Sequence, residues 1–210
     1  MTAVDAEPAV YVVDDDPSVR IALEDLFESI GLPLLTFPSV GAFLEHRHGQ
    51  GPSCLVLDVR MPGRSGTDFH LQMDGMGLRM PVVFITAHGD IAMGVKAIKA
   101  GAADFLTKPF RDQELLDAVN SAIDRDRRRL GQERLEADLK ARWETLTSGE
   151  RDVFDLVVTG LLNKQIASEL DIKEVTVKVR RARIMQKMAA GSLADLVRMA
   201  DQLKARQSDR

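Results

Sequence analysis

The first 124 residues alternate short apolar runs with amphipathic segments, and this alternation constrains the fold more than any other feature. Runs rich in β-branched residues predict strands at Val10–Val13, Leu34–Phe37, Cys54–Leu57, Val82–Thr86 and Asp104–Leu106. Segments of helical periodicity follow these strands, at Pro17–Ile30, Ser39–His46, Thr67–Met73, Ile91–Ala100 and Asp112–Asp124. Apolar strands separated by such helices favour βαβ units. We therefore expect an α/β fold with a doubly wound, five-stranded parallel sheet.

Cysteine content and hydropathy indicate the cellular location of the protein. The chain has 210 residues, one cysteine (Cys54) and no apolar run of the roughly 18 residues that a membrane span needs. A single cysteine cannot form an internal disulfide, and the first eight residues lack the basic and apolar regions of a secretory signal. These features predict a cytoplasmic protein that has no membrane partner.

The net charge of −4 hides an asymmetry along the chain. Residues 1–124 carry 9 Lys and Arg against 18 Asp and Glu, a net charge of −9. Residues 125–145 have a net charge of +2, and residues 146–210 have a net charge of +3. An acidic front and a mildly basic back predict two modules with different partners.

The segment 123–146 predicts a helix that links the two modules, because it is rich in Arg, Glu and Lys. Its apolar residues at roughly helical spacing are Leu130, Leu135, Leu139 and Trp143. The apolar stripe of this helix either packs against a neighbouring element or pairs with the same helix of a second copy in a dimer. Gly131 interrupts the pattern, and no heptad is sustained.

The residues after this segment have helical patterns and no strand pattern. Four are expected, at Ser148–Thr159, Asn163–Leu170, Glu174–Met188 and Ser192–Lys204. A short helix, a turn of three residues and a longer basic helix form a helix-turn-helix pattern. Such a pattern indicates DNA binding, in which the longer helix enters the major groove.

The helix expected at Glu174–Met188 has two distinct faces at 100° per residue. Its core face holds Val177, Ile184 and Met188. The opposite side holds Lys178, Val179 and Ala182, with Arg183 toward one flank. These groups either contact a major groove or form an ordinary solvated helix face.

Acidic residues follow two of the predicted strands. Asp14, Asp15 and Asp16 follow the first strand, and Asp58 follows the third. The carboxyl ends of parallel strands meet at one sheet edge, so these groups are expected to converge with Thr86 and Lys108. Crowded carboxylates repel unless a cation joins them, and Mg²⁺ fits this donor set.

With a cation bound beside it, Asp58 is predicted to act as a carboxylate nucleophile that attacks a phosphoryl group. Thr86 would donate a hydrogen bond to that group, and Lys108 would neutralise its charge. Asp16 precedes Pro17, and this pair is typical of a helix N-cap followed by proline at the first helical position.

Four blocks of the front module resemble the signature blocks of two-component receiver domains: Val12–Asp16 (VVDDD), Leu57–Gly63 (LDVRMPG), Ile85–Ala87 (ITA) and Lys108–Phe110 (KPF). The resemblance implies a flavodoxin-like receiver fold, and it implies that a sensor histidine kinase phosphorylates Asp58. It also implies that Asp15, Asp58 and the Arg60 backbone carbonyl ligate Mg²⁺, while Asp14 helps through water.

The resemblance further implies that Thr86 and Lys108 sense the phosphoryl group and that the Lys108–Pro109 bond is cis. Phe105 stands where the family often has a tyrosine that acts as a rotamer switch. It either swings inward on phosphorylation or is an ordinary buried strand residue. The surface of the fourth helix, with Val95 and Ile98, is by the same analogy a dimerisation face, although both side chains could equally pack against the sheet.

Three blocks of the back module resemble the LuxR-type helix-turn-helix: Leu146–Arg151 (LTSGER), Gly160–Ala167 (GLLNKQIA) and Val175–Val179 (VTVKV). Together the two halves are similar to response regulators of the NarL/FixJ class, and most similar to the FixJ branch. Lys178, Val179 and Ala182 would then face bases. The residues expected nearer the DNA backbone are Asn163, Lys164, Thr176 and Arg183.

Two residues of this module depart from the family pattern. Lys173 stands where a Ser or Thr usually caps the recognition helix, and Glu174 in the first turn partly compensates through the helix dipole. Arg180 replaces the usual histidine near the core face, and its long stem is expected to carry the charge to solvent or phosphate.

The sequence therefore predicts a receiver domain at 9–124, a linker helix at 125–145 and a LuxR-type DNA-binding domain at 146–205. The expected function is transcription regulation rather than enzymatic turnover, apart from assistance to the receiver's own phosphorylation and dephosphorylation. Phosphorylation would promote a homodimer that binds promoter DNA, with RNA polymerase as a further partner. Two alternatives are an aspartate-nucleophile phosphatase and a DNA-binding dimer with a silent acidic pocket.

Overall fold

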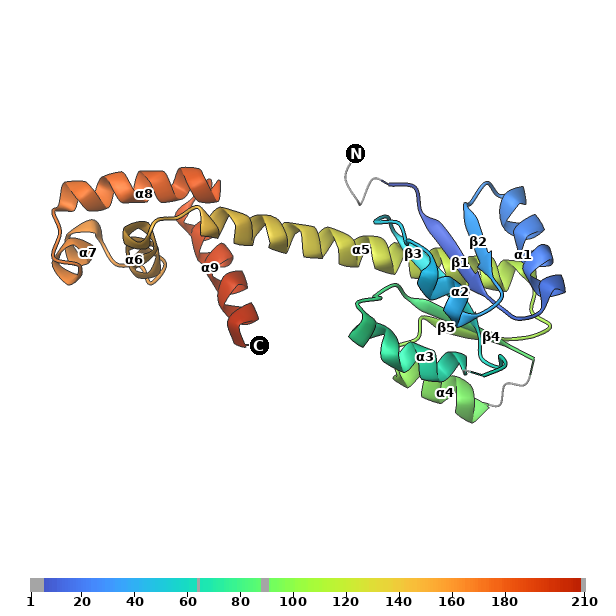
Figure 1. Ribbon diagram of the computed structural model, residues 1–210. Helices are drawn as coiled ribbons and strands as arrows, with labels where there is room; N and C mark the ends of the chain where they lie inside the picture. The colour runs from blue at the N-terminus through green and yellow to red at the C-terminus, as the bar shows by residue number, and fades with distance from the viewer. Residues whose placement is uncertain (1–5, 64, 88–90, 209–210) are drawn as a thin grey trace. The chain divides into compact units, whose positions relative to one another are not determined.

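The computed structural model describes residues 6–63, 65–87 and 91–208, without the side chains of residues 91 and 205–208. The chain divides into two compact units, Met1–Gly131 and Gln132–Arg210, which are called the first and second units below. Figure 1 labels the helices and strands of both units. No described helix carries an apolar stretch sufficient to cross a lipid bilayer.

The first unit contains a five-stranded parallel sheet in the order β2-β1-β3-β4-β5. The strands are β1 (Ala9–Val13), β2 (Leu34–Phe37), β3 (Ser53–Asp58), β4 (Val82–Thr86) and β5 (Asp104–Thr107). The helices of this unit are α1 (Pro17–Ser29), α2 (Val40–Glu45), α3 (Gly66–Met73), the short 3₁₀ helix η1 (Asp74–Met76), α4 (Ile91–Lys99) and the first part of α5 (Asp112–Glu144). The predicted doubly wound sheet is confirmed.

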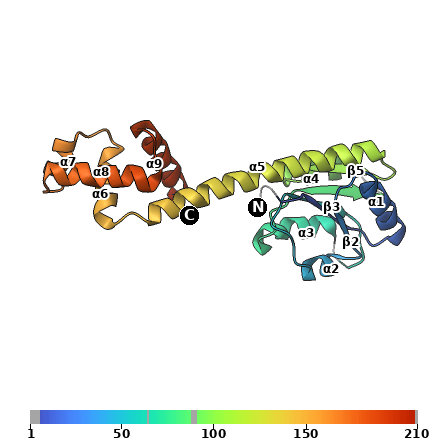
Figure 2. The same ribbon diagram turned by 90° about the horizontal axis from the view of Figure 1, so that it is seen from above.

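Helices cover both faces of this sheet (Figure 2). On one face, Phe27 of α1 and Leu115 of α5 pack against the strand residues Val10, Val56 and Ile85. On the other face, α2, α3 and α4 enclose the second core cluster. Its members from these helices and the facing strands include Phe43, Phe69, Ala97, Tyr11, Leu57 and Phe84.

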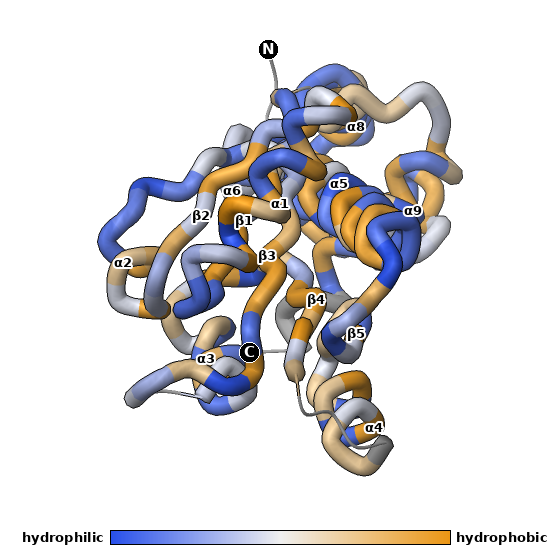
Figure 3. Tube along the Cα trace, turned by 90° about the vertical axis from the view of Figure 1, so that its right-hand side faces the viewer, coloured by the Kyte–Doolittle hydropathy of each residue, from blue (hydrophilic) through white to orange (hydrophobic). Residues whose placement is uncertain are grey.

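Burial on both faces explains why the central strands are apolar throughout. All residues of β3 and β4 are buried, and these strands are among the most hydrophobic segments of the trace (Figure 3). Because every strand is parallel, Val13, Asp58 and Thr86 all lie at the carboxyl edge of the sheet. Ligands of doubly wound sheets bind outside this edge.

Helix α5 is continuous from Asp112 to Glu144, so Gly131 does not interrupt it. Gly131 interrupts only the spacing of the apolar residues, as the sequence indicated. A glycine inside a helix lowers helix stability by about 1 kcal/mol relative to alanine. The strong helix formers around Gly131 (Leu, Arg, Gln and Glu) offset this loss. The early part of α5 is fixed to the sheet by Asp126, whose Oδ2 accepts a hydrogen bond from the Ser53 backbone N–H at 2.9 Å.

The second unit consists of the end of α5 and the helices α6 (Ser148–Val157), α7 (Asn163–Glu169), α8 (Glu174–Met188) and α9 (Leu193–Ser208). Its core contains Phe154, Ile166, Val177, Ile184 and Met188, each at most 2% exposed. Leu139 and Trp143 of α5 pack into the same cluster. The predicted core face of the helix Glu174–Met188 is therefore confirmed.

An ion pair between a buried glutamate and a partly exposed lysine joins α6 to α8 in this unit. Glu150 is 3% exposed, and its Oε2 lies 2.6 Å from Lys187 Nζ. The same oxygen accepts the Thr147 backbone N–H at 2.9 Å, while Thr147 Oγ1 accepts from the Glu150 N–H and completes a capping box. Burial alone would raise the pKa of Glu150, but the bonds from Lys187 and Thr147 outweigh it and lower that pKa.

The Glu150→Gln variant is expected to lose about 1.5–3 kcal/mol of stability, since it removes charge-assisted hydrogen bonds from a buried site. A depressed pKa contributes stability that is present above the unfolded value of about 4.3 and lost as the pH falls through the folded value. Urea unfolding followed by fluorescence of Trp143, the single tryptophan of the chain, measures this for the second unit.

The Glu174→Gln variant is the matched control, because Glu174 forms an exposed pair with Lys178 and should lose less than about 1 kcal/mol. Equal losses in the two variants, or an unchanged acid dependence in Glu150→Gln, would contradict the role of burial.

Candidate functional site

Three carboxylates converge at the carboxyl edge of the sheet. Asp14 and Asp15 follow β1, and Asp58 ends β3. One carboxylate oxygen from each lies within 4.8 Å of the other two. Asp14 is fully buried, Asp58 is 7% exposed and Asp15 is exposed. The predicted meeting of these three acids at one edge is therefore observed.

Lys108 is the cation nearest to these acids. Its Nζ lies 2.5 Å from Asp14 Oδ2 and 3.2 Å from Asp58 Oδ2. The Lys108 backbone N–H donates to the Thr86 carbonyl at 2.7 Å, and the Lys108–Pro109 bond is cis, as the resemblance implies. Burial would lower the pKa of Lys108, but its contacts with Asp14 and Asp58 outweigh burial and raise that pKa. The amine therefore stays protonated beside the acids.

Both side-chain oxygens of Asp14 are already used by the protein. Oδ2 faces Lys108, and Oδ1 accepts the Asp16 backbone N–H at 2.9 Å. Burial raises the pKa of Asp14 in spite of these bonds. Arg20 of α1 donates to the Asp14 backbone carbonyl at 2.7 Å and so holds the loop between β1 and α1. Sequence reasoning missed Arg20, because only the turn geometry brings it back to this loop.

Asp16 stands apart from the acid cluster. Its side chain accepts the Ser18 backbone N–H at 2.8 Å and caps α1, with Pro17 at the first helical position. The N-cap interpretation of Asp16 is confirmed. Because Asp16 is committed to the helix, the carboxylates that could bind a metal ion here are those of Asp14, Asp15 and Asp58.

Gly66 is a second residue that sequence reasoning missed. A Cβ built on it would lie 2.2 Å from the Asp58 backbone carbonyl, closer than any real contact. The start of α3 therefore approaches the end of β3 only because residue 66 has no side chain. A glycine at the beginning of a predicted helix, eight residues after Asp58, was the available signal.

Thr86 lies on β4, the strand beside the one that ends at Asp58, and Phe105 lies on the next strand, β5. Thr86 is fully buried at the end of β4. Phe105 of β5 is partly exposed and packs against the core cluster that also contains Phe84. Its ring lies against α4, where a Cβ added to Gly94 would come within 3.1 Å of Phe105 Cδ1.

The exposed face of α8 carries the residues predicted to meet DNA. Lys178, Val179, Ala182 and Arg183 are all exposed. Lys178 Nζ lies 3.0 Å from Glu174 Oε1 on the same face. Such a helix presents both cationic and apolar groups to solvent, while its other side is anchored in the core.

The N-terminus of α7 adjoins this helix. Asn163 is half-buried, and its Oδ1 accepts from Arg181 Nη1 of α8 at 2.7 Å. Lys164 is exposed, and Thr176 is half-buried in the first turn of α8. The four residues expected near the DNA backbone thus come from the first turns of α7 and α8, with Arg183 further along α8.

The two departures from the family pattern have different outcomes. Lys173 is the N-cap of α8 and makes no side-chain capping bond, as its chemistry predicts. Arg180 is partly exposed, and its Nη1 donates to the Gly149 carbonyl at 3.1 Å, a partner that the sequence did not predict. A Cβ on Gly149 would lie 2.7 Å from Arg180 Cζ, so the absent side chain of Gly149 makes room for the guanidinium.

Comparisons with known proteins agree with both halves of this architecture. Residues 10–120 match the response regulator receiver domain, and residues 144–200 match the bacterial regulatory proteins of the luxR family. Nodulation protein W of Bradyrhizobium diazoefficiens is 50% identical over 96% of this chain and 89% of its own. Response regulator protein TodT of Pseudomonas putida is 46% identical over 95% of this chain and 88% of its own.

Solved structures of response regulators are also similar to this chain. The low-resolution structure of the response regulator StyR is 48% identical, with a TM-score of 0.86 over 94% of this chain and 100% of that one. Full-length FixJ from B. japonicum is 39% identical, with a TM-score of 0.55 over 92% of this chain and 96% of that one.

The sheet, the acidic pocket and the matched families define the chain as a response regulator. Within that class it belongs to the NarL/FixJ regulators, which join a receiver domain to a luxR-type DNA-binding domain. Its function is therefore phosphorylation-dependent regulation of transcription. Membership in a family of transcription regulators also argues against the phosphatase alternative.

Proposed function

We propose that Asp58 accepts a phosphoryl group from a sensor histidine kinase and that this event controls DNA binding by α8. The observation that carries the proposal is the position of Asp58, which meets Asp14 and Asp15 within 4.8 Å and Lys108 at 3.2 Å. A nucleophilic carboxylate needs neighbouring cations when the incoming phosphoryl group is negative.

Mg²⁺ is the cation that we propose for this pocket. Hard oxygen donors and an exposed carboxylate, Asp15, fit a small divalent ion that keeps several waters. Asp15, Asp58 and the backbone carbonyl of Arg60 would hold it. Asp14 would act through water, because it is fully buried and its Oδ2 faces Lys108. When bound, Mg²⁺ neutralises charge on the phosphoryl oxygens.

In the proposed transfer, an Asp58 carboxylate oxygen forms a bond to phosphorus as the phosphorus–nitrogen bond of the kinase phosphohistidine breaks. The electron pair of that bond returns to the imidazole of the kinase. Lys108 stays protonated and compensates the charge that arrives at Asp58, while the Thr86 hydroxyl donates to a phosphoryl oxygen. The receiver would assist its own dephosphorylation with the same groups, without turning over a separate substrate.

We propose that phosphorylation of Asp58 changes the surface formed by α4 and β5. Thr86 would move toward the phosphoryl group, and Phe105 would repack against Gly94 and the neighbouring strand. Val95 and Ile98 of α4 are 48% and 46% exposed, so neither is an ordinary sheet-packing residue. We propose this face as the homodimer interface of the phosphorylated protein. Phosphorylation acts as a switch only by favouring one of two conformations.

The proposed DNA contacts follow from exposure on α7 and α8. Lys178, Val179 and Ala182 would face bases, and only such contacts carry sequence information. The residues proposed to contact phosphates are Asn163, Lys164, Thr176 and Arg183. The cytoplasm is the proposed location, because promoter DNA is the target. RNA polymerase is a proposed further partner, through contacts made at the promoter.

Phosphorylation with acetyl phosphate tests the metal requirement of this function. The wild-type chain should become labelled in the presence of Mg²⁺ and remain unlabelled when the metal is chelated, because uncompensated acids repel the phosphoryl anion. Intact-protein mass spectrometry measures the added phosphoryl group. Equal labelling with and without the metal would contradict the proposed role of the three acids.

A further inference from the structure

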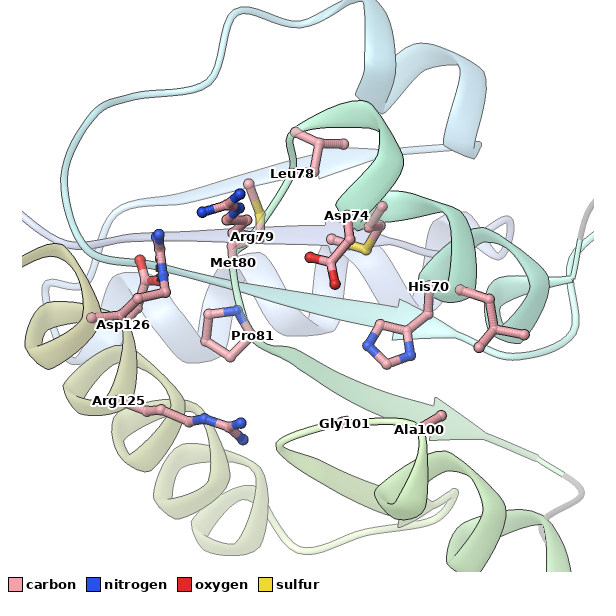
Figure 4. A pocket seen from close by; sticks show the side chains of 13 residues that line it. His70, Asp74, Leu78, Arg79, Met80, Pro81, Ala100, Gly101, Arg125 and Asp126 are labelled. Carbon is pink, nitrogen blue, oxygen red and sulfur yellow. Dashed lines mark hydrogen bonds and ion pairs between the residues drawn. The ribbon is translucent and has the colours of Figure 1, made fainter. Parts of the chain in front are cut away.

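A cavity of about 550 Å³ lies in the first unit, at the end of the sheet opposite to Asp58 (Figure 4). Its walls come from α3 and η1, from the residues that lead into β4, from the turn between α4 and β5, and from α5. The phosphorylation chemistry uses none of these residues. The cavity is therefore a candidate for a separate ligand.

The charge of the cavity differs from that of the unit around it. Residues 1–131 have 13 Lys and Arg against 19 Asp and Glu, a net charge of −6. The cavity nevertheless gathers three arginines against two aspartates: Arg79, Arg125, Arg129, Asp74 and Asp126. An arginine-rich recess in an acidic unit favours an anion over a cation.

One of the two aspartates is already neutralised. Asp126 is 1% exposed, and its Oδ2 accepts from the Ser53 backbone N–H. Its Oδ1 lies 2.8 Å from Arg129 Nη2 and 2.9 Å from Arg129 Nε. Asp126 and Arg129 thus neutralise each other, which leaves Arg79 and Arg125 against Asp74 in the cavity.

Arg125 supplies the cationic group for a ligand. Figure 4 shows Arg125 extending from α5 and His70 from α3 toward the same space, beside Pro81. Within residues 6–63, 65–87 and 91–208, Arg125 has no ion-pair partner. A guanidinium presents a planar set of donors that matches a carboxylate. Burial lowers the pKa of His70, so its neutral ring adds hydrogen-bonding groups rather than charge.

The remaining walls are mostly apolar. They consist of Leu71, Met73, Leu78, Met80, Pro81 and Ala100. Gly101 leaves further space, because a Cβ built on it would meet no atom within 4 Å. A purely inorganic anion would leave these walls without contacts, whereas an organic acid would use both parts of the cavity.

We propose that this cavity binds a small organic carboxylate, with its carboxylate on Arg125 and its apolar body against Met80 and Pro81. Bound there, the ligand would join α5 to α3 and to the residues before β4. It would therefore stabilise the first unit independently of phosphorylation at Asp58.

Nuclear magnetic resonance titration of the full-length, unphosphorylated chain tests the proposal with three probes that share one ring: benzoate, benzamide and benzylamine. Benzoate should shift the amides of Ala100 and Gly101 in a saturable way, whereas benzamide and benzylamine should bind at least about 10-fold more weakly. The Arg125→Gln variant should lose at least about 10-fold in benzoate affinity, since it loses a charge-assisted pair.

The Arg128→Gln variant is the matched control, because Arg128 lies on the same helix, is exposed and does not line the cavity. Its benzoate affinity should equal that of the wild type. Absence of saturable shifts up to 20 mM benzoate (roughly the weak limit for a fragment of this size), tighter binding of benzylamine, or equal affinities of the two variants would overturn the proposal. Circular dichroism of Arg125→Gln verifies that the exposed substitution leaves the fold intact.

Discussion

The Asp58→Asn variant is expected to lose all stable phosphorylation by acetyl phosphate and Mg²⁺. An amide is not the nucleophile that a carboxylate is, and it removes one negative charge from the three acids, whose oxygens meet within 4.8 Å. Asp14 is not expected to substitute, because it is fully buried whereas Asp58 is 7% exposed. Intact-protein mass spectrometry should find the phosphoryl group on the wild type and none on the variant.

The Asp16→Asn variant is the matched control for this result. It makes the same chemical change two residues from Asp14, and asparagine caps a helix about as well as aspartate does. Asp16 caps α1 and lies outside the group of acids, so labelling should continue. Phosphoryl label retained on Asp58→Asn, or lost equally in both variants, would contradict the assignment of Asp58.

The Lys178→Ala variant is expected to weaken promoter binding by about 10- to 100-fold per half-site and to change the preferred bases, since a lost base contact costs about 1–3 kcal/mol. Lys178 is exposed on α8 and must leave its pair with Glu174 to reach a base. Selection from a random DNA library, followed by titration of the selected site, measures both the affinity and the base preference.

The Lys164→Ala variant separates base recognition from phosphate contact. Lys164 is exposed at the start of α7, and its loss should weaken all sequences alike and reduce the salt dependence of binding. The Lys140→Ala variant of α5, far from α8 in the sequence, should bind DNA as the wild type does. An unchanged base preference in Lys178→Ala would exclude this lysine from the major groove.

The sequence predicted the sheet closely because the strands are buried on both faces. Such strands must be apolar throughout, and turn residues mark their ends. The observed β3 and β4 differ from the prediction by one residue at most. The meeting of the acids could also be predicted, because parallel strands bring Asp14, Asp15 and Asp58 to one edge of the sheet whatever their spacing in the chain.

The rest depended on contacts that no local pattern contains. Arg180 turns inward because Gly149, 31 residues earlier, leaves room for its guanidinium. The cavity beside Arg125 forms from five separate segments, and its charge balance depends on the ion pair between Asp126 and Arg129.

The affinity of the full chain for its selected DNA site, measured with and without beryllofluoride and Mg²⁺, tests the central claim most directly. Sedimentation of the same samples reports the oligomeric state. Occupation of the Asp58 site by the phosphoryl mimic should convert monomer to dimer and tighten DNA binding, and Asp58→Asn should respond to neither. Equal affinity and equal sedimentation in both conditions would contradict the account and favour a constitutive DNA-binding dimer with a silent acidic pocket.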